Sequence, residues 1–225
     1  MAMSPYYEES VRLGTEFQKN NKNWAGYDVV KYQKLIKDLV VRYNVKTILD
    51  YGCGKGLQYK EKLPYGRLPG EEIPESKWQT FDEYLGVTVY PYDPCVEEHN
   101  QLPDTAIKFD GVICTQVLNS IPDDDMSWVR DLLQQHSAKF CFVAVNFQRE
   151  AKAKKTMYDS DYFRLPRTRE FFRSHYNNWS GSDLFWWWKD RPYYAVWAED
   201  QLSGTWLDVP TQFEGKYQYI EVNHR

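Results

Sequence analysis

The segment from Thr47 to Gly56, with the sequence TILDYGCGKG, constrains the fold of this chain more than any other stretch. Its first half is apolar and β-branched, as in a strand that is covered on both faces. Its second half carries Gly52, Gly54 and Gly56, which allow a tight turn and close approach of the backbone to a ligand. A glycine turn that leads from a parallel strand into a helix presents free amides to ligands. The segment therefore predicts an α/β fold with a nucleotide-type cofactor at this strand end.

The rest of the chain alternates between predicted helices and strands. Apolar residues recur at helical spacing over 28–43. The composition predicts further strands at 85–92, 109–114 and 140–146 and further helices at 123–135 and 167–176. Residues 59–82 hold five prolines and glycines, which predict a long loop. The aromatic segments 184–188 and 193–197 flank a four-residue turn and predict a hairpin.

Length and composition favour a single domain. With 225 residues, 42% of them hydrophobic, the chain can bury one sizeable core. We expect one domain over 1–225, with an N-terminal helical cover at 1–44, a loop insertion at 59–82 and a C-terminal tail at 204–225. The spacing between Asp93 and Phe109 leaves no room for the usual crossover helix, so we expect that part of the fold to be trimmed.

Charge and residue types exclude several classes of protein. The net charge of −4 gives no global attraction to nucleic acid or to an anionic membrane. The apolar stretches are far shorter than the roughly 20 residues of a membrane helix, and the N-terminus has no secretory pattern, so we predict no membrane partner and a cytoplasmic location. The four cysteines and four histidines show no disulfide framework and no metal-ligand spacing. The range from Arg149 to Arg173 has eight basic and four acidic residues, so it either holds a phosphate-bearing acceptor or is a solvated helix face.

The acid inside the glycine pattern narrows the choice of cofactor. A dinucleotide-binding turn more often has its acid roughly 20 residues later, whereas Asp50 comes directly before the glycines. The pattern Asp-x-Gly-x-Gly-x-Gly resembles the first motif of class I S-adenosylmethionine (SAM)-dependent methyltransferases. Over residues 27–147 the chain is similar to a subgroup of small methyltransferases from bacteriophages and bacteria. The resemblance implies a Rossmann-like SAM-methyltransferase domain, with a mostly parallel sheet and a C-terminal antiparallel hairpin.

The resemblance also implies which residues hold SAM. An acid at the end of the second strand accepts the ribose hydroxyls in this family, and Asp93 matches it, although Asp-Pro also starts turns. A carboxylate has two acceptor oxygens for the two cis hydroxyls. N-terminal segments cover the cavity in relatives, which makes Tyr6, Tyr7, Trp24 and Tyr27 candidates for that role. The candidate SAM-binding residues are Asp50, Tyr51, Gly52, Cys53, Gly54, Gly56, Tyr92, Asp93, Pro94, Gln116 and Val117.

The segment from Gln116 to Pro122 differs from the family pattern. Relatives carry Asp-Val-Leu-Glu-His-Ile-Pro there, and this chain has QVLNSIP, so amides and a hydroxyl replace two carboxylates and an imidazole. Gln116 either hydrogen-bonds the cofactor or acceptor, or caps a strand. No catalytic residue is therefore assigned. We expect a SAM-dependent methyltransferase for a small-molecule, nucleotide or other soluble acceptor, and the alternatives are a non-catalytic SAM-binding protein and a SAM-using enzyme with other chemistry.

Overall fold

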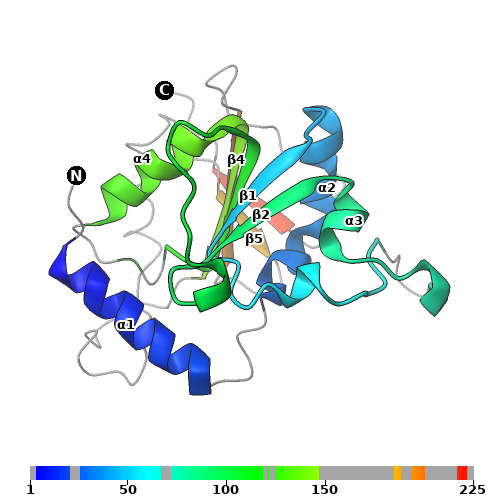
Figure 1. Ribbon diagram of the computed structural model, residues 1–225. Coiled ribbons are helices and arrows are strands. Elements are labelled where there is room, and N and C mark those ends of the chain that lie inside the picture. The colour runs from blue at the N-terminus through cyan, green and yellow to red at the C-terminus, as the bar shows by residue number, and fades with distance from the viewer. Residues whose placement is uncertain are drawn as a thin grey trace.

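A β-sheet with helices on both faces forms the centre of the computed structural model (Figure 1). The structure describes residues 4–20, 26–66, 72–118, 121, 125–146, 185–188, 194–200 and 217–221. Its α-helices are α1 (Pro5–Asn20), α2 (Gln33–Arg42), α3 (Phe81–Leu85) and α4 (Met126–His136). Its strands are β1 (Thr47–Tyr51), β2 (Thr88–Tyr92), β3 (Phe109–Thr115), β4 (Ser137–Asn146), β5 (Phe185–Trp188), β6 (Tyr194–Asp200) and β7 (Tyr217–Glu221). Short 3-10 helices are η1 (Tyr27–Tyr32), η2 (Leu57–Tyr59), η3 (Glu75–Lys77) and η4 (Glu97–His99).

The strand order of the main sheet is β2-β1-β3-β4-β6. Strands β2, β1, β3 and β4 are parallel, and β6 is antiparallel to β4. From β1 the chain passes first to β2 on one side and then to β3 on the other side. Ligands of open α/β sheets bind at such a reversal, outside the carboxyl ends of the strands. The predicted α/β class with a Rossmann-like, mostly parallel sheet is confirmed, and the switch point lies at the end of β1.

Alternation along the strands divides the core into two clusters. Leu49, Val112 and Cys141 face one side, where they pack with α4 and with Tyr7 of α1. Ile48 and Ile113 face the other side, where they pack with α2 and η1. Figure 1 shows α4 and α2 on opposite sides of the sheet. The strands are therefore apolar on both faces, as the sequence of β1 predicted.

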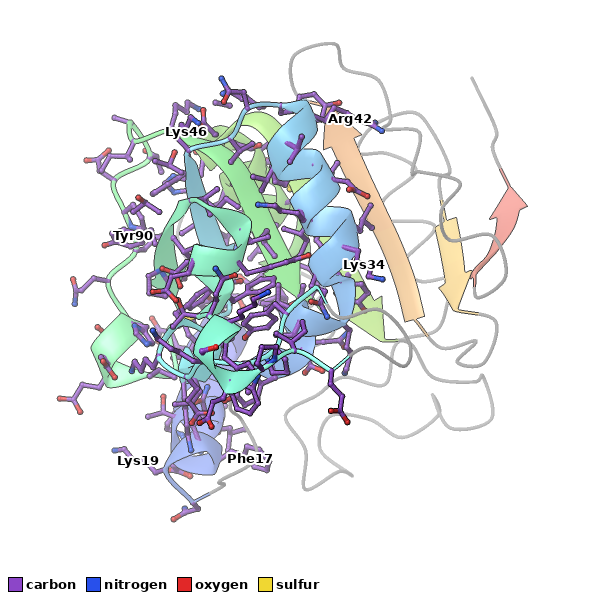
Figure 2. The ribbon with its side chains drawn as sticks, turned by 90° about the vertical axis from the view of Figure 1, so that its right-hand side faces the viewer. Phe17, Lys19, Lys34, Arg42, Lys46 and Tyr90 are labelled. Atoms are coloured by element: carbon purple, nitrogen blue, oxygen red, sulfur yellow. The ribbon has the colours of Figure 1, made fainter. Side chains whose placement is uncertain are left out.

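Strand β2 is an edge of the sheet. The segment 93–108 that follows it contains only η4, so the predicted trimming is confirmed. The amide of Thr88 donates to the Lys46 carbonyl on the β1 side, so the backbone nitrogen of Pro91 faces away from β1. Proline, which has no amide hydrogen, fits that outward position. Tyr90 of the same strand is 39% exposed, and Figure 2 shows it at the outer side of the sheet, away from Lys34 and Arg42 on α2.

Some predicted boundaries shift in the structure. The predicted strand 85–92 begins only at Thr88, because Leu85 is the last residue of α3. Thr80 and Glu83 form a reciprocal capping box at the start of α3, and Gly86 ends the helix in the left-handed conformation. The predicted helix 28–43 is divided into η1 and α2. The predicted helix 167–176 lies outside the described residues.

The predicted C-terminal hairpin is wrong. Strand β6 pairs with β4 over seven residues, and β5 pairs with β7, which lies within the predicted tail 204–225. A turn sequence acts only between neighbouring segments. The open edge of β4 and the distant β7 offer longer-range partners that the sequence pattern does not reveal.

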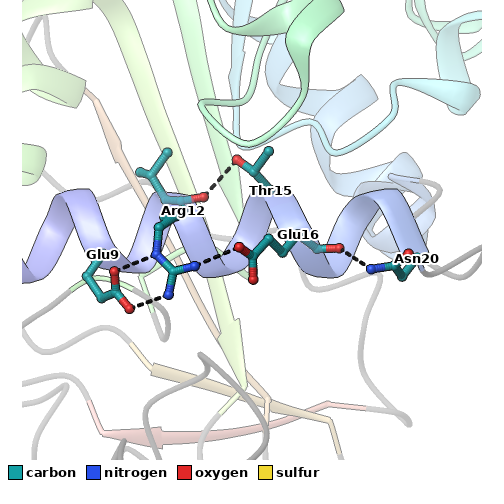
Figure 3. Close-up of polar contacts among 6 residues, drawn as sticks. Glu9, Arg12, Thr15, Glu16 and Asn20 are labelled. Carbon is teal, nitrogen blue, oxygen red and sulfur yellow. Dashed lines mark hydrogen bonds and ion pairs between the residues drawn. The ribbon is translucent and has the colours of Figure 1, made fainter.

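Helix α1 lies across the carboxyl end of the sheet. Its buried residues Tyr7, Ser10, Gly14 and Gln18 recur at helical spacing and form one face. On the exposed face Arg12 bridges Glu9 and Glu16 at 2.6 Å each (Figure 3). Among the described residues, no helix combines the length and the hydropathy needed to cross a lipid bilayer.

Candidate functional site

The glycine turn after β1 adopts the conformation that its sequence requires. The φ angles of Gly52, Gly54 and Gly56 are 87°, 61° and 63°, all in the left-handed region that side chains disfavour. A Cβ at Gly52 would lie 2.0 Å from Val117, and one at Gly56 would lie 2.8 Å from Nε2 of His99. Glycine is therefore needed here for the backbone conformation and for close contact with the chain's own side chains.

The amides of this turn are used within the protein. Those of Gly52 and Cys53 donate to the carbonyl of Tyr92 at 2.6 and 3.0 Å. The Gly54 amide donates to Oδ2 of Asp93 at 2.9 Å, and the Gly56 amide donates to the Cys53 carbonyl at 3.3 Å. The sequence predicted amides that are free for a ligand, but buried amides are almost always paired. The turn is thus attached to the end of β2.

Asp93 lies at the end of β2 and is 6% exposed. Its Oδ1 accepts a hydrogen bond from the Cys95 amide at 2.8 Å, and its Oδ2 accepts the one from Gly54. Burial raises the pKa of Asp93, and the hydrogen bonds from the Cys95 and Gly54 amides oppose that shift. The side chain of Gln18, from α1, also acts to lower the pKa of Asp93.

Asp50 is the second acid of the site and is 1% exposed. Its Oδ2 accepts hydrogen bonds from the Tyr59 hydroxyl at 2.6 Å and from the Gln58 amide at 3.3 Å. Its Oδ1 is buried and has no hydrogen-bond partner. Burial raises the pKa of Asp50 to about 7, against the effect of these two hydrogen bonds.

The segment after β3 reaches the same place. Val117 packs over Gly52, as the contact described above shows. Gln116 is 8% exposed, has a positive φ of 62°, and donates its backbone amide to the Ala144 carbonyl at 2.7 Å. A positive φ is uncommon for a residue other than glycine and is found at functional sites more often than elsewhere. The ends of β1, β2 and β3 thus meet at the glycine turn.

Helix α1 packs against the loop that follows β2. The Cys95 thiol lies 3.6 Å from the Val11 carbonyl, and a Cβ at Gly14 would lie 2.6 Å from Cys95 Sγ. Tyr7 is buried in the same cluster as Tyr51 and Tyr92. The helix start is attached to α4, where the Ser4 amide donates to Oδ1 of Asp125 at 3.0 Å.

Most of the predicted SAM-binding residues therefore come together around the glycine turn. Pro94 follows Asp93 and is partly buried. Of the predicted covering residues, Tyr7 is buried in the core and Tyr27 donates to Glu61, while Trp24 and the side chain of Tyr6 lie outside the described residues. The range Arg149–Arg173 and residues 119, 120 and 122 also lie outside them.

Sequence reasoning missed three residues of the site. Gln58 and Tyr59 hold Asp50, and His99 lies against Gly56 with its Nε2 buried and unpaired. Gln58 and Tyr59 follow the glycine turn directly, where a helix of this fold starts. Their position after the turn was the one sequence signal that they could lie in the site. Nothing in the sequence places His99 beside a turn more than 40 residues earlier.

Comparisons with known proteins give structural similarity alone. No protein-family model matches the sequence, and no curated protein matches it. The structure named as the DhpI-SAM-HEP complex is 12% identical at a TM-score of 0.48, over 88% of this chain and 98% of that one. Human N-acetylserotonin methyltransferase in complex with SAM is 15% identical at a TM-score of 0.46, over 85% of this chain and 55% of that one. Magnesium protoporphyrin IX methyltransferase from Synechocystis PCC 6803 with bound S-adenosylhomocysteine (SAH) is 14% identical at a TM-score of 0.45, over 88% of each chain. None of these similarities indicates a methyl acceptor for this chain.

Proposed function

We propose that this protein is a SAM-dependent methyltransferase that binds SAM at the carboxyl ends of β1 and β2. The observation that carries the proposal is the 2.9 Å hydrogen bond from the Gly54 amide to Asp93, which joins two motifs 39 residues apart. The resemblance to the family implied a SAM-binding turn and a ribose-binding acid in two separate segments. Their contact at the switch point of the sheet is the arrangement that both roles require.

The chemistry of the described groups fits SAM. The two carboxylate oxygens of Asp93 can accept the two ribose hydroxyls in addition to the backbone amides that they already bind. Asp50 has an unpaired buried oxygen beside the turn, where the resemblance places the methionine part of SAM. His99 adds a buried ring nitrogen beside Gly56. Bound SAM would supply a methyl group on a positively charged sulfur.

Methyl transfer mainly requires that the acceptor is aligned with that methyl group. SAM held at the glycine turn and Asp93 would supply the methyl group and would be converted to SAH when an acceptor takes it. Holding the reactants in line in a dry site can supply several kcal/mol, up to roughly 10. The residues described after β3, Gln116 to Leu118, contain no acid or base, so they can position an acceptor but cannot take a proton from it.

The same segment supports the alternative of a non-catalytic SAM-binding protein, because it lacks the chargeable groups of relatives. A third possibility is a SAM-using enzyme with other chemistry. A small-molecule, nucleotide or other soluble acceptor stays a prediction, and so does a phosphate-bearing one held by Arg149–Arg173. A cytoplasmic location and a relationship with the phage subgroup also stay predictions.

Calorimetry with SAM and with SAH tests the cofactor assignment. We expect both to bind the wild-type protein, and Asp93→Ala to weaken binding at least tenfold, since each hydrogen bond to a charged group contributes about 1.5–3 kcal/mol. Glu97→Ala, an exposed acid in the same loop, is the matched control and should leave binding unchanged. Absence of binding, or unchanged binding by Asp93→Ala, would overturn the assignment.

Turnover separates the enzyme from the binding protein. The protein is incubated with SAM that carries a labelled methyl group, together with cell extract or a panel of nucleotides. An enzyme forms SAH in an amount that depends on the acceptor. Tight binding of SAM with no SAH formed under any condition would favour the non-catalytic alternative.

A further inference from the structure

Helix α1 buries two polar side chains that make no hydrogen bond. Ser10 and Gln18 lie on its inner face with Tyr7 and Gly14, and they are 7% and 4% exposed. The hydroxyl oxygen of Ser10 and both amide atoms of Gln18 are buried without a hydrogen-bond partner among the described residues. Burial of an unpaired polar group is unfavourable, and a helix that served only for packing would carry apolar side chains at these positions.

The unpaired amide of Gln18 lies beside Asp93, whose charged form it favours. The packing of α1 explains this position. Gly14, one helical turn before Gln18, rests on Cys95, because a Cβ at Gly14 would lie 2.6 Å from Cys95 Sγ. Cys95 in turn donates its backbone amide to Oδ1 of Asp93 at 2.8 Å. The next turn of the same face therefore brings Gln18 to the acid at the end of β2.

A hydroxyl group of a ligand fits between Gln18 and Asp93. A hydroxyl donates one hydrogen and accepts through its lone pairs, so it can donate to the carboxylate of Asp93 and accept from Nε2 of Gln18. A carboxylate or phosphate there would be repelled by Asp93. An ammonium group has hydrogens to donate but no lone pair, so it would leave Nε2 of Gln18 unpaired.

We propose that Gln18 is a further cofactor-binding residue, which donates a hydrogen bond to a ribose hydroxyl that Asp93 accepts. This inference rests on the proposed function. With the hydroxyl between the two side chains, the end of α1 rests on the ligand instead of on Asp93. Gln18 thus makes binding specific for a nucleoside with a free ribose hydroxyl at this position, and it links cofactor binding to the position of α1.

Calorimetry with SAH and with its 2′-deoxy and 3′-deoxy analogues tests this contact in the wild-type protein and in Gln18→Leu. Leucine is similar in size to glutamine and can neither donate nor accept a hydrogen bond. We expect Gln18→Leu to weaken SAH binding about fivefold, as the loss of one neutral hydrogen bond does. The affinity for one of the two deoxy analogues, which lacks the hydroxyl that faces Gln18, should stay unchanged.

Ser10→Ala is the matched control. It removes the other unpaired polar group from the inner face of α1, about 12 Å from Gln18 along the helix, and should leave all three affinities unchanged. Unchanged SAH binding by Gln18→Leu, or an equal loss for SAH and both analogues, would overturn this inference and leave the proposed function intact. No binding of SAH to the wild-type protein would overturn the proposed function itself.

Tryptic cleavage after Lys19 gives a second measurement, which needs only the wild-type protein and serves if Gln18→Leu does not fold. Lys19 is exposed and follows Gln18 directly, so its rate of cleavage reports how firmly the end of α1 is held. At saturating concentration SAH should slow the cleavage severalfold, and the deoxy analogue without the contacted hydroxyl should slow it much less. Equal protection by SAH and both analogues contradicts a contact between Gln18 and the ribose.

Discussion

A disulfide between helix α1 and the loop after β2 should lock the cover of the site. The Cβ of Gly14→Cys would lie 3.5 Å from the Cβ of Cys95, at the lower limit of the roughly 3.5–4.5 Å found in disulfides. The 2.6 Å contact with Cys95 Sγ, too close for an unbonded atom, is relieved by a small movement when the two sulfurs bond. We expect air or a mild oxidant to form the bond.

The size of the effect follows from the loop that the bond closes. Residues 14 to 95 enclose about 80 residues, for which the chain-entropy relation gives about 4.5 kcal/mol of stabilisation. In a chain of this length that corresponds to a rise in Tm on the order of 10 °C. Unfolding in urea with and without reductant measures the difference, and Gly14→Cys combined with Cys95→Ser is the control that cannot cross-link.

Cofactor binding supplies the second measurement. Asp93 is 6% exposed and Gln18 of α1 lies beside it, so we expect that ribose hydroxyls reach it only when α1 moves. The oxidised variant should bind SAH at least tenfold more weakly than the same protein after reduction. If no cross-link forms, α1 does not rest on Cys95 as described. If the cross-linked protein binds SAH as well as the reduced one, the path to Asp93 does not run beneath α1.

Three further predictions concern stability. The pKa of Asp50, about 7, lies above the value of 3.8 for an unshifted Asp. The contribution of Asp50 to the free energy of unfolding is therefore complete below about pH 4 and is lost as the pH rises through 7. Urea titrations should show that the free energy of unfolding falls by on the order of 4 kcal/mol over this range, and that the fall is absent in Asp50→Asn. Gly52→Ala should destabilise by more than about 3 kcal/mol, because it adds a clash with Val117 to the cost of a positive φ. Gly86→Ala should cost only about 1 kcal/mol, because the nearest atom to its Cβ would be Nζ of Lys37 at 3.9 Å, an ordinary van der Waals contact. A similar loss from both would refute the clash. Thr80→Ala removes the capping box of α3 and should cost about 1 kcal/mol in the same assay, and an unchanged midpoint would refute that role.

The parts of the fold that depend on local sequence could be predicted. Strand β1, its glycine turn and the acid Asp93 are each encoded within a few residues, and they meet where the motif requires. Helix α3 was hidden by the prolines and glycines around it, although Thr80 and Glu83 carry the capping pattern. The partners of β5 and β6 depend on contacts between distant segments, and a turn-like sequence at 189–192 indicated the wrong pairing.

The sequence could predict which backbone segments form the site, but it could not predict the side-chain contacts within it. The motif identified Asp50, but nothing in it indicated that Tyr59 and Gln58 would bind one oxygen and leave the other unpaired. It also did not reveal that Val117 and His99 would occupy the space over the glycines. Such details depend on how the ends of three strands pack, and local spacing does not encode that packing.

The position of Pro91 bears on how the protein behaves at high concentration. In the described part of the chain the sheet stops at β2, and an open sheet edge is a template for pairing with other chains. Because alternate residues of an edge strand direct their amides outward, the missing amide of Pro91 removes a donor from the middle of that ladder. Among the described strands, β2 therefore offers no continuous ladder of donors for edge-to-edge aggregation.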